Sequence, residues 1–220
     1  MGEGQYDWSR QANERWFLRA AKARGVPRFL AFACSPPARL TRTGYPHCGP
    51  ETGTTNLKPG AEGQFARYLA DILKHFADNP DESERITFDT ISPVNEPQWA
   101  WDGNSLEVCR ASNDDLRALI VSLHAELRRQ GLDTEIITPE SGSLPDMWSR
   151  NGGASQRWGA TYGDYIDELC GNAQVSELLA RRIAYHSYWS DDPGGQLLQN
   201  RERLCEAMGR YPDWRLWQTE

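Results

Sequence analysis

Three glutamates at the ends of apolar runs are the residues best suited to chemistry. Glu96 lies within Asn95-Glu96-Pro97 after one run, Glu140 ends a second, and Glu220 ends a third. Two carboxylates that face each other across a bound molecule can split a glycosidic bond, because one protonates the leaving oxygen while the other attacks the anomeric carbon or activates water. The pattern therefore predicts a carboxylate pair. Glu96 is one member, and Glu140 competes with Glu220 for the other place.

Aromatic residues follow the same apolar runs. The candidates for contact with a ligand are Trp99, Trp101, Trp148, Trp158, Tyr188 and Trp189. Aromatic side chains in long loops suit stacking on the apolar faces of sugar rings. For Trp99 and Trp101 a packing role is an equal alternative, whereas Trp16 and Trp217 lie inside element patterns and are expected in the core. His186 either contacts the ligand or makes a core hydrogen bond.

The elements that must position these residues alternate between two hydrophobic periods, and the alternation occurs five times. Strands are expected at 29–34, 86–94, 135–139, 183–188 and 215–219, and helices at 10–24, from about 60 to 76, from 112 to about 127, from 162 to 169 and from 197 to 208. A further helical stretch is possible at 175–179. Ser112, followed three residues later by Asp115, resembles a capping arrangement at the start of the third helix.

The alternation predicts an α/β fold with a parallel sheet. Segments leaving the strands are long, at 35–60, 97–111 and 141–161, so the elaboration lies at the carboxyl ends, where barrel enzymes build their sites. No glycine-rich phosphate turn follows a strand, which favours a (β/α)8 TIM-type barrel over an open nucleotide-binding sheet. Five strands make that barrel incomplete, and two apolar edges would be left open. Residues 1–220 are therefore expected to be a single partial domain of a longer protein.

Composition narrows the class of protein. The chain has 220 residues, 24 Lys and Arg against 31 Asp and Glu, a formal net charge of -7, and 39% hydrophobic residues. Such a chain has enough apolar surface to fold, and its acidity argues against a nucleic-acid partner. No run approaches the ~20 apolar residues of a membrane span, and the polar start is unlike a secretory signal.

The five cysteines contain no Cys-x-x-Cys pair, which argues against a zinc site. Cys170 and Cys205 fall on apolar faces of expected helices and are assigned to the core. No metal or organic cofactor is expected, because a carboxylate pair supplies both the acid and the nucleophile.

Several motifs resemble glycoside hydrolase family 30, a family within the clan of (β/α)8 retaining glycosidases. They are Phe32-Ala-Cys-Ser-Pro-Pro37, Ile91 through Trp99, Ala184 through Trp189 and Leu216 through Glu220, which would follow or lie on barrel strands three, four, six and seven. Tyr6-Asp-Trp-Ser, Asn56-Leu-Lys-Pro59 and Phe88 through Trp99 are most similar to the branch that includes endo-β-1,6-galactanases. Cys34 and Ala38-Arg39 depart from the family pattern around Ser-Pro-Pro.

The resemblance implies a role for each matching residue. Glu96 would be the general acid/base and Glu220 the nucleophile, while Asn95 would bind the sugar hydroxyl next to the anomeric carbon. Tyr188 or His186 would orient the nucleophile, and Glu140 becomes a substrate contact rather than the nucleophile.

The expected function is that of a retaining endo-glycosidase acting on a β-linked polysaccharide, with β-1,6-galactan as the first choice of substrate. Xylan, β-1,6-glucan or a glucosylated lipid are the alternative substrates. A non-catalytic carbohydrate-binding barrel, or an inactive fragment, is the alternative from another class. A polysaccharide substrate implies an extracytoplasmic location, and the pattern specifies no oligomeric state.

Overall fold

A five-stranded parallel sheet forms the centre of the protein. The computed structural model describes residues 2, 4–103, 106–190 and 196–220. The strands are β1 (Leu30–Phe32), β2 (Thr90–Ser92), β3 (Glu135–Ser141), β4 (Leu179–Tyr185) and β5 (Arg215–Gln218), and they pair in sequence order. The register places Leu30 beside Thr90, and Ile183 beside Leu216. This confirms the expected parallel α/β sheet.

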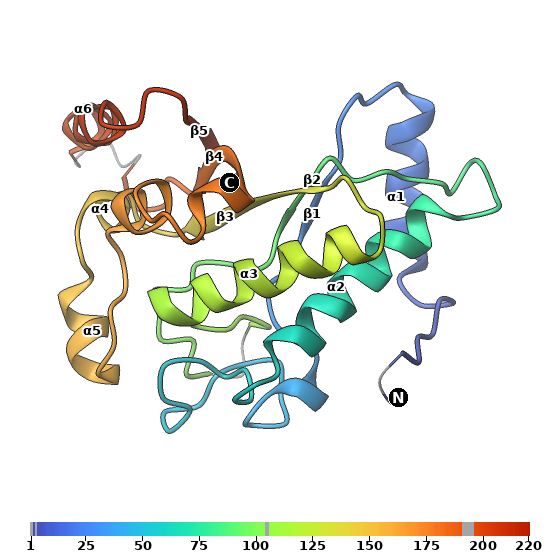
Figure 1. The fold of residues 1–220 in the computed structure, drawn as a ribbon, viewed down its shortest axis with the longest axis horizontal. Coiled ribbons are helices and arrows are strands. Elements are labelled where there is room, and N and C mark those ends of the chain that lie inside the picture. Colours follow the sequence, from blue (N-terminus) through green and yellow to red (C-terminus); the bar gives the residue numbers. More distant parts are fainter. Residues whose placement is uncertain (1, 3, 104–105, 191–195) are drawn as a thin grey trace.

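Helices alternate with the strands along the chain. The longer ones are α1 (Ala12–Ala23), α2 (Glu62–Ala77), α3 (Asn113–Arg129) and α6 (Leu197–Met208). Shorter helical segments are η1 (Ala38–Leu40), α4 (Pro145–Trp148), α5 (Gly152–Trp158), the π-helical η2 (Ile166–Cys170) and η3 (Ser176–Leu178). Figure 1 shows α2 and α3 side by side, where they pack against each other. None of the described helices is long and apolar enough to cross a bilayer.

Helix α3 illustrates how local sequence sets an element. The Ser112 hydroxyl accepts from the Asp115 backbone N–H, and the Asp115 carboxylate accepts from the Ser112 N–H, which completes the expected capping box. Acidic residues occupy the first turn and arginines the last, as the helix dipole favours. Its apolar stripe is fully buried in the core, through Leu116, Ile120, Leu123 and Leu127. Burial of this stripe ties α3 to the rest of the molecule.

Several expected elements have other bounds in the structure. The expected strand 29–34 is reduced to Leu30–Phe32, and the expected strand 183–188 lies instead at Leu179–Tyr185. Two more elements are shortened. The expected strand 86–94 is paired only over Thr90–Ser92, because Pro93 has no N–H with which to continue the ladder, while Ile86 and Phe88 are buried by packing. The expected helix 162–169 is reduced to the five residues of η2. Gly163, with φ +79, and Asp164, with φ +57, turn the chain left-handed before the helix can begin.

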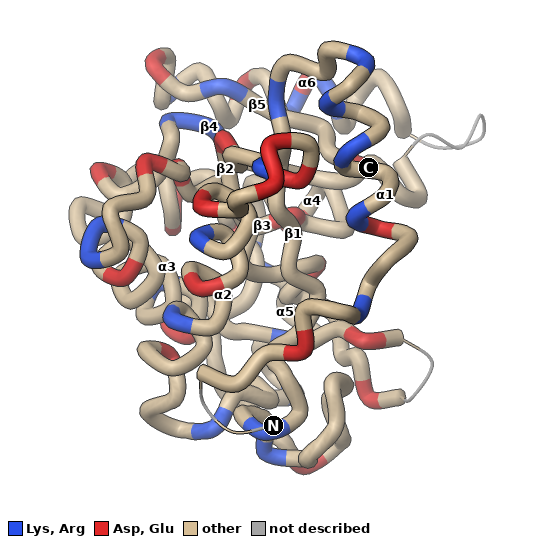
Figure 2. Tube along the Cα trace, turned by 90° about the vertical axis from the view of Figure 1, so that its right-hand side faces the viewer, with Lys and Arg blue, Asp and Glu red and all other residues tan. Residues whose placement is uncertain are grey.

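Two core assignments were wrong. Trp16 is 53% exposed, and no residue of α1 is buried. Cys205 is exposed because the neighbouring Leu204 takes the inward position on α6. Cys170 is buried as expected, and Trp217 is half-buried beneath the Arg182 guanidinium. Acidic and basic residues are interspersed over the face shown in Figure 2, without a basic stripe.

Candidate active site

The ends of four neighbouring strands bring the polar candidates together. Glu96 follows β2 by four residues, and Glu140 is the penultimate residue of β3. His186 follows β4 directly, and Glu220 follows β5 by two residues. Because parallel strands have their carboxyl ends on the same edge of a sheet, these side chains meet there. The backbone supports the arrangement, since Glu96 N–H donates to the Glu140 carbonyl at 2.9 Å and His186 N–H donates to the Ser141 carbonyl at 2.7 Å.

An open pocket of about 490 Å³ lies at this edge of the sheet. Its lining residues are Asn95, Glu96, Trp99, Trp101, Leu106, Tyr188, Trp189 and Glu220. Both members of the Glu96–Glu220 pair therefore reach the same space, and aromatic rings surround them. Leu106 is the lining residue that the sequence did not indicate, because an isolated leucine in a loop carries no motif.

His186 lies at the centre of the carboxylates. Its Nδ1 is 2.8 Å from Glu96 Oε1 and 3.5 Å from Glu220 Oε2, and its Nε2 is 3.4 Å from Glu140 Oε2. The Tyr188 hydroxyl donates to Glu220 Oε2 at 3.0 Å. One oxygen of Glu96, one of Glu220 and a ring nitrogen of His186 all lie within 4.8 Å of one another. His186 thus lies between the two glutamates that line the pocket, Glu96 and Glu220, and the buried Glu140.

The charges of the site act strongly on this histidine. Burial opposes the imidazolium, but the adjacent Glu140 and Glu96 carboxyl groups, together with the Glu220 charge, raise the pKa of His186 to about 9. His186 therefore keeps its proton at neutral pH. The carboxylate of Glu220 also raises the pKa of the Tyr188 hydroxyl, which keeps Tyr188 a hydrogen-bond donor.

The raised pKa predicts a pH-dependent stability. A histidine with an ordinary pKa of 6.5 and a folded pKa of about 9 stabilises the fold fully below pH 6.5 and loses that contribution as the pH rises to 9. Wild-type protein should lose up to roughly 3 kcal/mol over this window, and His186→Gln should show a flatter profile. Urea unfolding at pH 6, 7.5 and 9.5 measures the difference.

His124 supplies the matched control for this experiment. It lies half-buried on α3, where burial lowers its pKa, so its titration falls below the same window. His124→Gln should therefore keep the wild-type slope between pH 6.5 and 9. Equal slopes for wild type and His186→Gln would contradict the assignment of the imidazolium to this cluster.

The backbone of the site is strained. Among the described residues, seven non-glycine positions have positive φ, and four of them, Glu96, Trp101, Glu140 and Trp189, belong to the site or its rim. A left-handed non-glycine residue costs on the order of 1–3 kcal/mol and tends to occur where function fixes a side chain. The sequence gives no sign of this strain, because none of the four is a turn-forming glycine or asparagine.

Gly142 makes room for Glu96. A Cβ at this position would lie 2.5 Å from Glu96 Cδ and 2.5 Å from Trp99 Nε1, so any side chain would displace one of them. On the other side, Trp101 Nε1 donates to the Glu96 carbonyl at 2.8 Å. Glu96 is therefore held between the β3 loop and an indole, and Gly142 is a positioning residue that sequence patterns did not single out.

Four candidates from the sequence do not line the pocket. His186 is fully buried and makes a core hydrogen bond to Glu96, which was the alternative to a ligand contact. Glu140 is fully buried behind His186, where Thr219 donates to its carboxylate, so it is not placed for the expected contact with a substrate. Trp148 packs against the core from α4. Trp158 lies beneath the Arg110 guanidinium, whose carbon is 4.5 Å from the ring centre. The loop after β3 thus contributes packing rather than aromatic lining.

Glu96, His186 and Glu220 also form a set that could in principle ligate a divalent cation. A histidine must be neutral to bind a metal, whereas the carboxylates raise the pKa of His186 to about 9. A metal ion bound here would therefore have to displace the proton of His186.

The parallel α/β sheet and the paired carboxylates at its strand ends are the features of a barrel-type glycoside hydrolase. The family model for O-glycosyl hydrolase family 30 matches residues 1–220. The chain belongs to that family, and its five strands form part of an incomplete (β/α)8 barrel.

Known relatives agree with this assignment. The chain is 26% identical over 218 residues to an endo-beta-1,6-galactanase of Hypocrea rufa, covering 98% of this chain and 39% of the relative. It is 31% identical over 124 residues to an exo-beta-1,6-galactobiohydrolase of Bifidobacterium longum subsp. longum, covering 54% of this chain and 8% of the relative. A conserved exported protein from Bacteroides fragilis superposes with a TM-score of 0.85 at 27% identity, covering 99% of this chain and 43% of that one. The chain thus spans less than half the length of each.

Proposed function

We propose that the protein is a retaining glycoside hydrolase that cleaves β-1,6-linked galactan. The observation that carries the proposal is the placement of Glu96 and Glu220 on one pocket, with one oxygen of each within 4.8 Å of the other. Retention needs carboxyl groups about 5–5.5 Å apart, whereas inversion needs ~6.5–9.5 Å to admit a water molecule. The close approach of the two nearest oxygens leaves little room for a water molecule between the carboxyl groups, which supports the double displacement. Two relatives with β-1,6-galactan chemistry in their names support the choice of substrate.

In the proposed mechanism Glu220 attacks the anomeric carbon while Glu96 gives its proton to the departing sugar oxygen. The bond to that oxygen breaks, and the sugar remains as an ester on Glu220. Glu96 then takes a proton from water, which attacks the same carbon and releases Glu220. The hydrogen bond from Tyr188 and the nearby His186 orient the nucleophile during both steps.

The remaining lining residues would bind the sugar. Among the described residues no group hydrogen-bonds Oδ1 of Asn95, a residue that lines the pocket, and this amide would bind the sugar hydroxyl next to the anomeric carbon. Trp99, Trp101 and Trp189 present rings around the carboxylates for stacking. A polysaccharide substrate places the enzyme outside the cytoplasm, in line with the exported relative.

Product analysis tests the proposal. The protein that carries this chain is incubated with β-1,6-galactan, xylan and β-1,6-glucan, and the anomeric signals of the first products are followed by NMR. We expect cleavage of the galactan with the β-anomer formed first. Initial formation of the α-anomer would contradict retention, and binding of galactan without cleavage would establish the non-catalytic alternative. Cleavage of xylan or β-1,6-glucan instead would keep the mechanism and overturn the substrate.

A further inference from the structure

Two buried cysteines from different strand-end loops are neighbours in the structure. Cys48 lies in the loop after β1 and Cys109 in the loop after β2, and they are 1% and 7% exposed. Each thiol shifts the pKa of the other, as neighbouring groups do, and Cys109 Sγ donates to the Arg110 carbonyl at 3.3 Å. The Arg110 N–H, one residue beyond Cys109, also donates to Cys48 Sγ at 3.3 Å. The two sulfur atoms are therefore neighbours, although the residues are about 60 positions apart in the chain.

Arg110 holds the two loops in this arrangement. Its guanidinium is fully buried and donates to the Gly49 carbonyl at 2.8 Å, to the Gly53 carbonyl at 2.8 Å, and to the Thr52 hydroxyl. These three groups follow Cys48 in the chain, and Arg110 follows Cys109. The hydrogen bonds of Arg110 therefore hold the backbone next to Cys48 close to the backbone next to Cys109. Such preorganisation lowers the entropy that a covalent link would otherwise cost.

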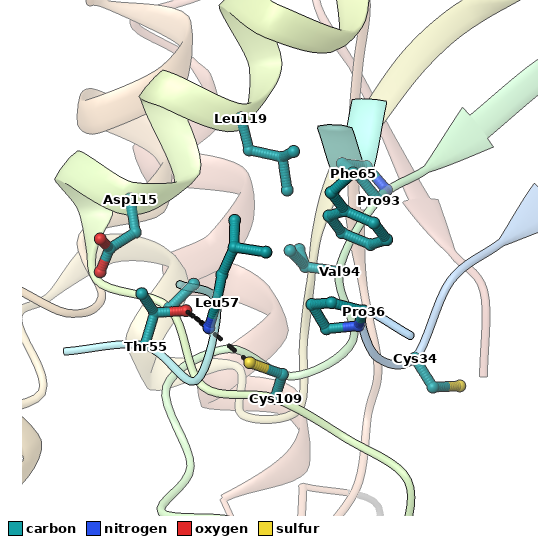
Figure 3. A pocket seen from close by; sticks show the side chains of 11 residues that line it. Cys34, Pro36, Thr55, Leu57, Phe65, Pro93, Val94, Cys109, Asp115 and Leu119 are labelled. Carbon is teal, nitrogen blue, oxygen red and sulfur yellow. Dashed lines mark hydrogen bonds between the residues drawn. The ribbon is translucent and has the colours of Figure 1, made fainter. Parts of the chain in front are cut away.

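Cys109 also has a polar contact with Thr55 of the loop that carries Cys48. Thr55 Oγ1 lies 3.7 Å from Cys109 Sγ, a contact that Figure 3 shows with the two side chains directed toward each other. In the same view Cys34 is directed away from Cys109. Cys34 and Cys205 are exposed, and Cys170 lies on η2. Of the five cysteines, Cys48 and Cys109 are therefore the two that we consider as a pair.

We propose that Cys48 and Cys109 form a disulfide that fastens the loop after β1 to the loop after β2. The oxidant is a disulfide compound, such as oxidised glutathione or a thiol–disulfide oxidoreductase. The Cys48 thiolate attacks one sulfur of that disulfide and expels the first thiol. Cys109 then loses its proton and attacks the Cys48 sulfur, which expels the second thiol. Two protein thiols are oxidised, and one disulfide of the oxidant is reduced to two thiols.

The order of attack agrees with the local electrostatics. The neighbouring Cys109 thiol lowers the pKa of the Cys48 thiol, and the Arg110 N–H contributes in the same direction. The pKa of Cys109 is raised by the neighbouring Cys48 thiol and by burial. Cys48 is therefore the first nucleophile. Because both sulfurs are buried, the exchange occurs while the chain folds or when the 42–56 loop opens.

The proposed disulfide would fix the loop that carries Arg110, which contacts the segment next to the pocket. Arg110 forms an ion pair with Asp102, the neighbour of the pocket residue Trp101. Closing a segment of about 60 residues restricts the unfolded chain, so the oxidised protein should melt higher than the reduced one. We expect a rise in Tm on the order of 5 °C or more.

Mass spectrometry of wild-type protein tests the proposal without relying on a variant. Reduced protein is equilibrated with oxidised glutathione, its free thiols are blocked with N-ethylmaleimide in denaturant, and it is digested without reduction. We expect a peptide that links Cys48 to Cys109, together with the rise in Tm and its reversal by dithiothreitol. Recovery of both cysteines as N-ethylmaleimide adducts, or a link from either one to Cys34, would overturn the proposal.

Variants then assign the thermal shift. Cys48→Ala and Cys109→Ala should each abolish the response of Tm to the oxidant. Cys205→Ala, which removes an exposed thiol on α6, should keep the full response. A shift that persists in Cys109→Ala would show that another reaction of the protein causes it, and would overturn the assignment to this pair.

Discussion

Replacing Glu220 with glycine is expected to lower kcat on the polysaccharide by about 10⁴-fold or more. The variant lacks the carboxylate that would form the glycosyl ester, and neither Tyr188 nor His186 can replace it, since one is a neutral phenol and the other an imidazolium at neutral pH. Steady-state kinetics of the protein that carries this chain measures the loss. A variant with a rate within tenfold of wild type would exclude Glu220 as the nucleophile.

Azide distinguishes the loss of a nucleophile from a loss of fold. In Glu220→Gly the anion can enter the vacated space and attack the anomeric carbon, while Glu96 protonates the leaving oxygen. The product is then an α-glycosyl azide, because a single displacement inverts the centre. Glu220→Gln, which keeps the size of the side chain, should be equally inactive and should not be rescued. Unchanged melting curves for both variants complete the control.

The positions of Glu96 and Glu220 could be predicted because they depend on topology alone. Strand ends of a parallel sheet share one edge, so a residue just past an apolar run is placed there whatever the details of packing. The same holds for the buried stripe of α3, where the spacing of leucines defines the inward face. These inferences use periodicity and chain order, which the sequence contains directly.

Periodicity and chain order could not predict that Glu220 lines the pocket while Glu140 is buried behind it. Both follow apolar runs, but β3 shifts register against β4 between Pro139 and Ser141, and Glu140 adopts a φ of +58. Its carboxylate is thereby buried behind His186 instead of reaching the pocket. A one-residue change of register reverses the direction of a side chain, and only tertiary packing decides it.

The environment of Glu96 could not be predicted from the sequence for a related reason. Close approach of Gly142, the hydrogen bond from the Trp101 indole, and the contact with His186 come from three segments of the chain. No local pattern records such convergence, since each residue is ordinary in its own segment. The same argument applies to Cys48 and Cys109, whose pairing depends on the buried guanidinium of Arg110.

Removal of the Glu96 carboxylate should produce a loss of activity that depends on the leaving group. For galactan, whose leaving alcohol needs a proton, Glu96→Ala should lower kcat by about 10²–10⁴-fold. For an aryl galactoside with an acidic phenol the first step needs no proton, so the glycosyl ester on Glu220 should form and accumulate.

Azide should then attack that ester, release the Glu220 carboxylate and give a β-glycosyl azide, the opposite anomer to that from Glu220→Gly. Glu107→Gln, which changes an exposed carboxylate of the same loop, serves as the matched control and should retain wild-type kinetics. An equal loss on both substrates, without azide rescue, would mean that Glu96 supports the fold of the site and transfers no proton. The contrast between substrates therefore separates acid catalysis from positioning, because only proton transfer is sensitive to the basicity of the departing oxygen.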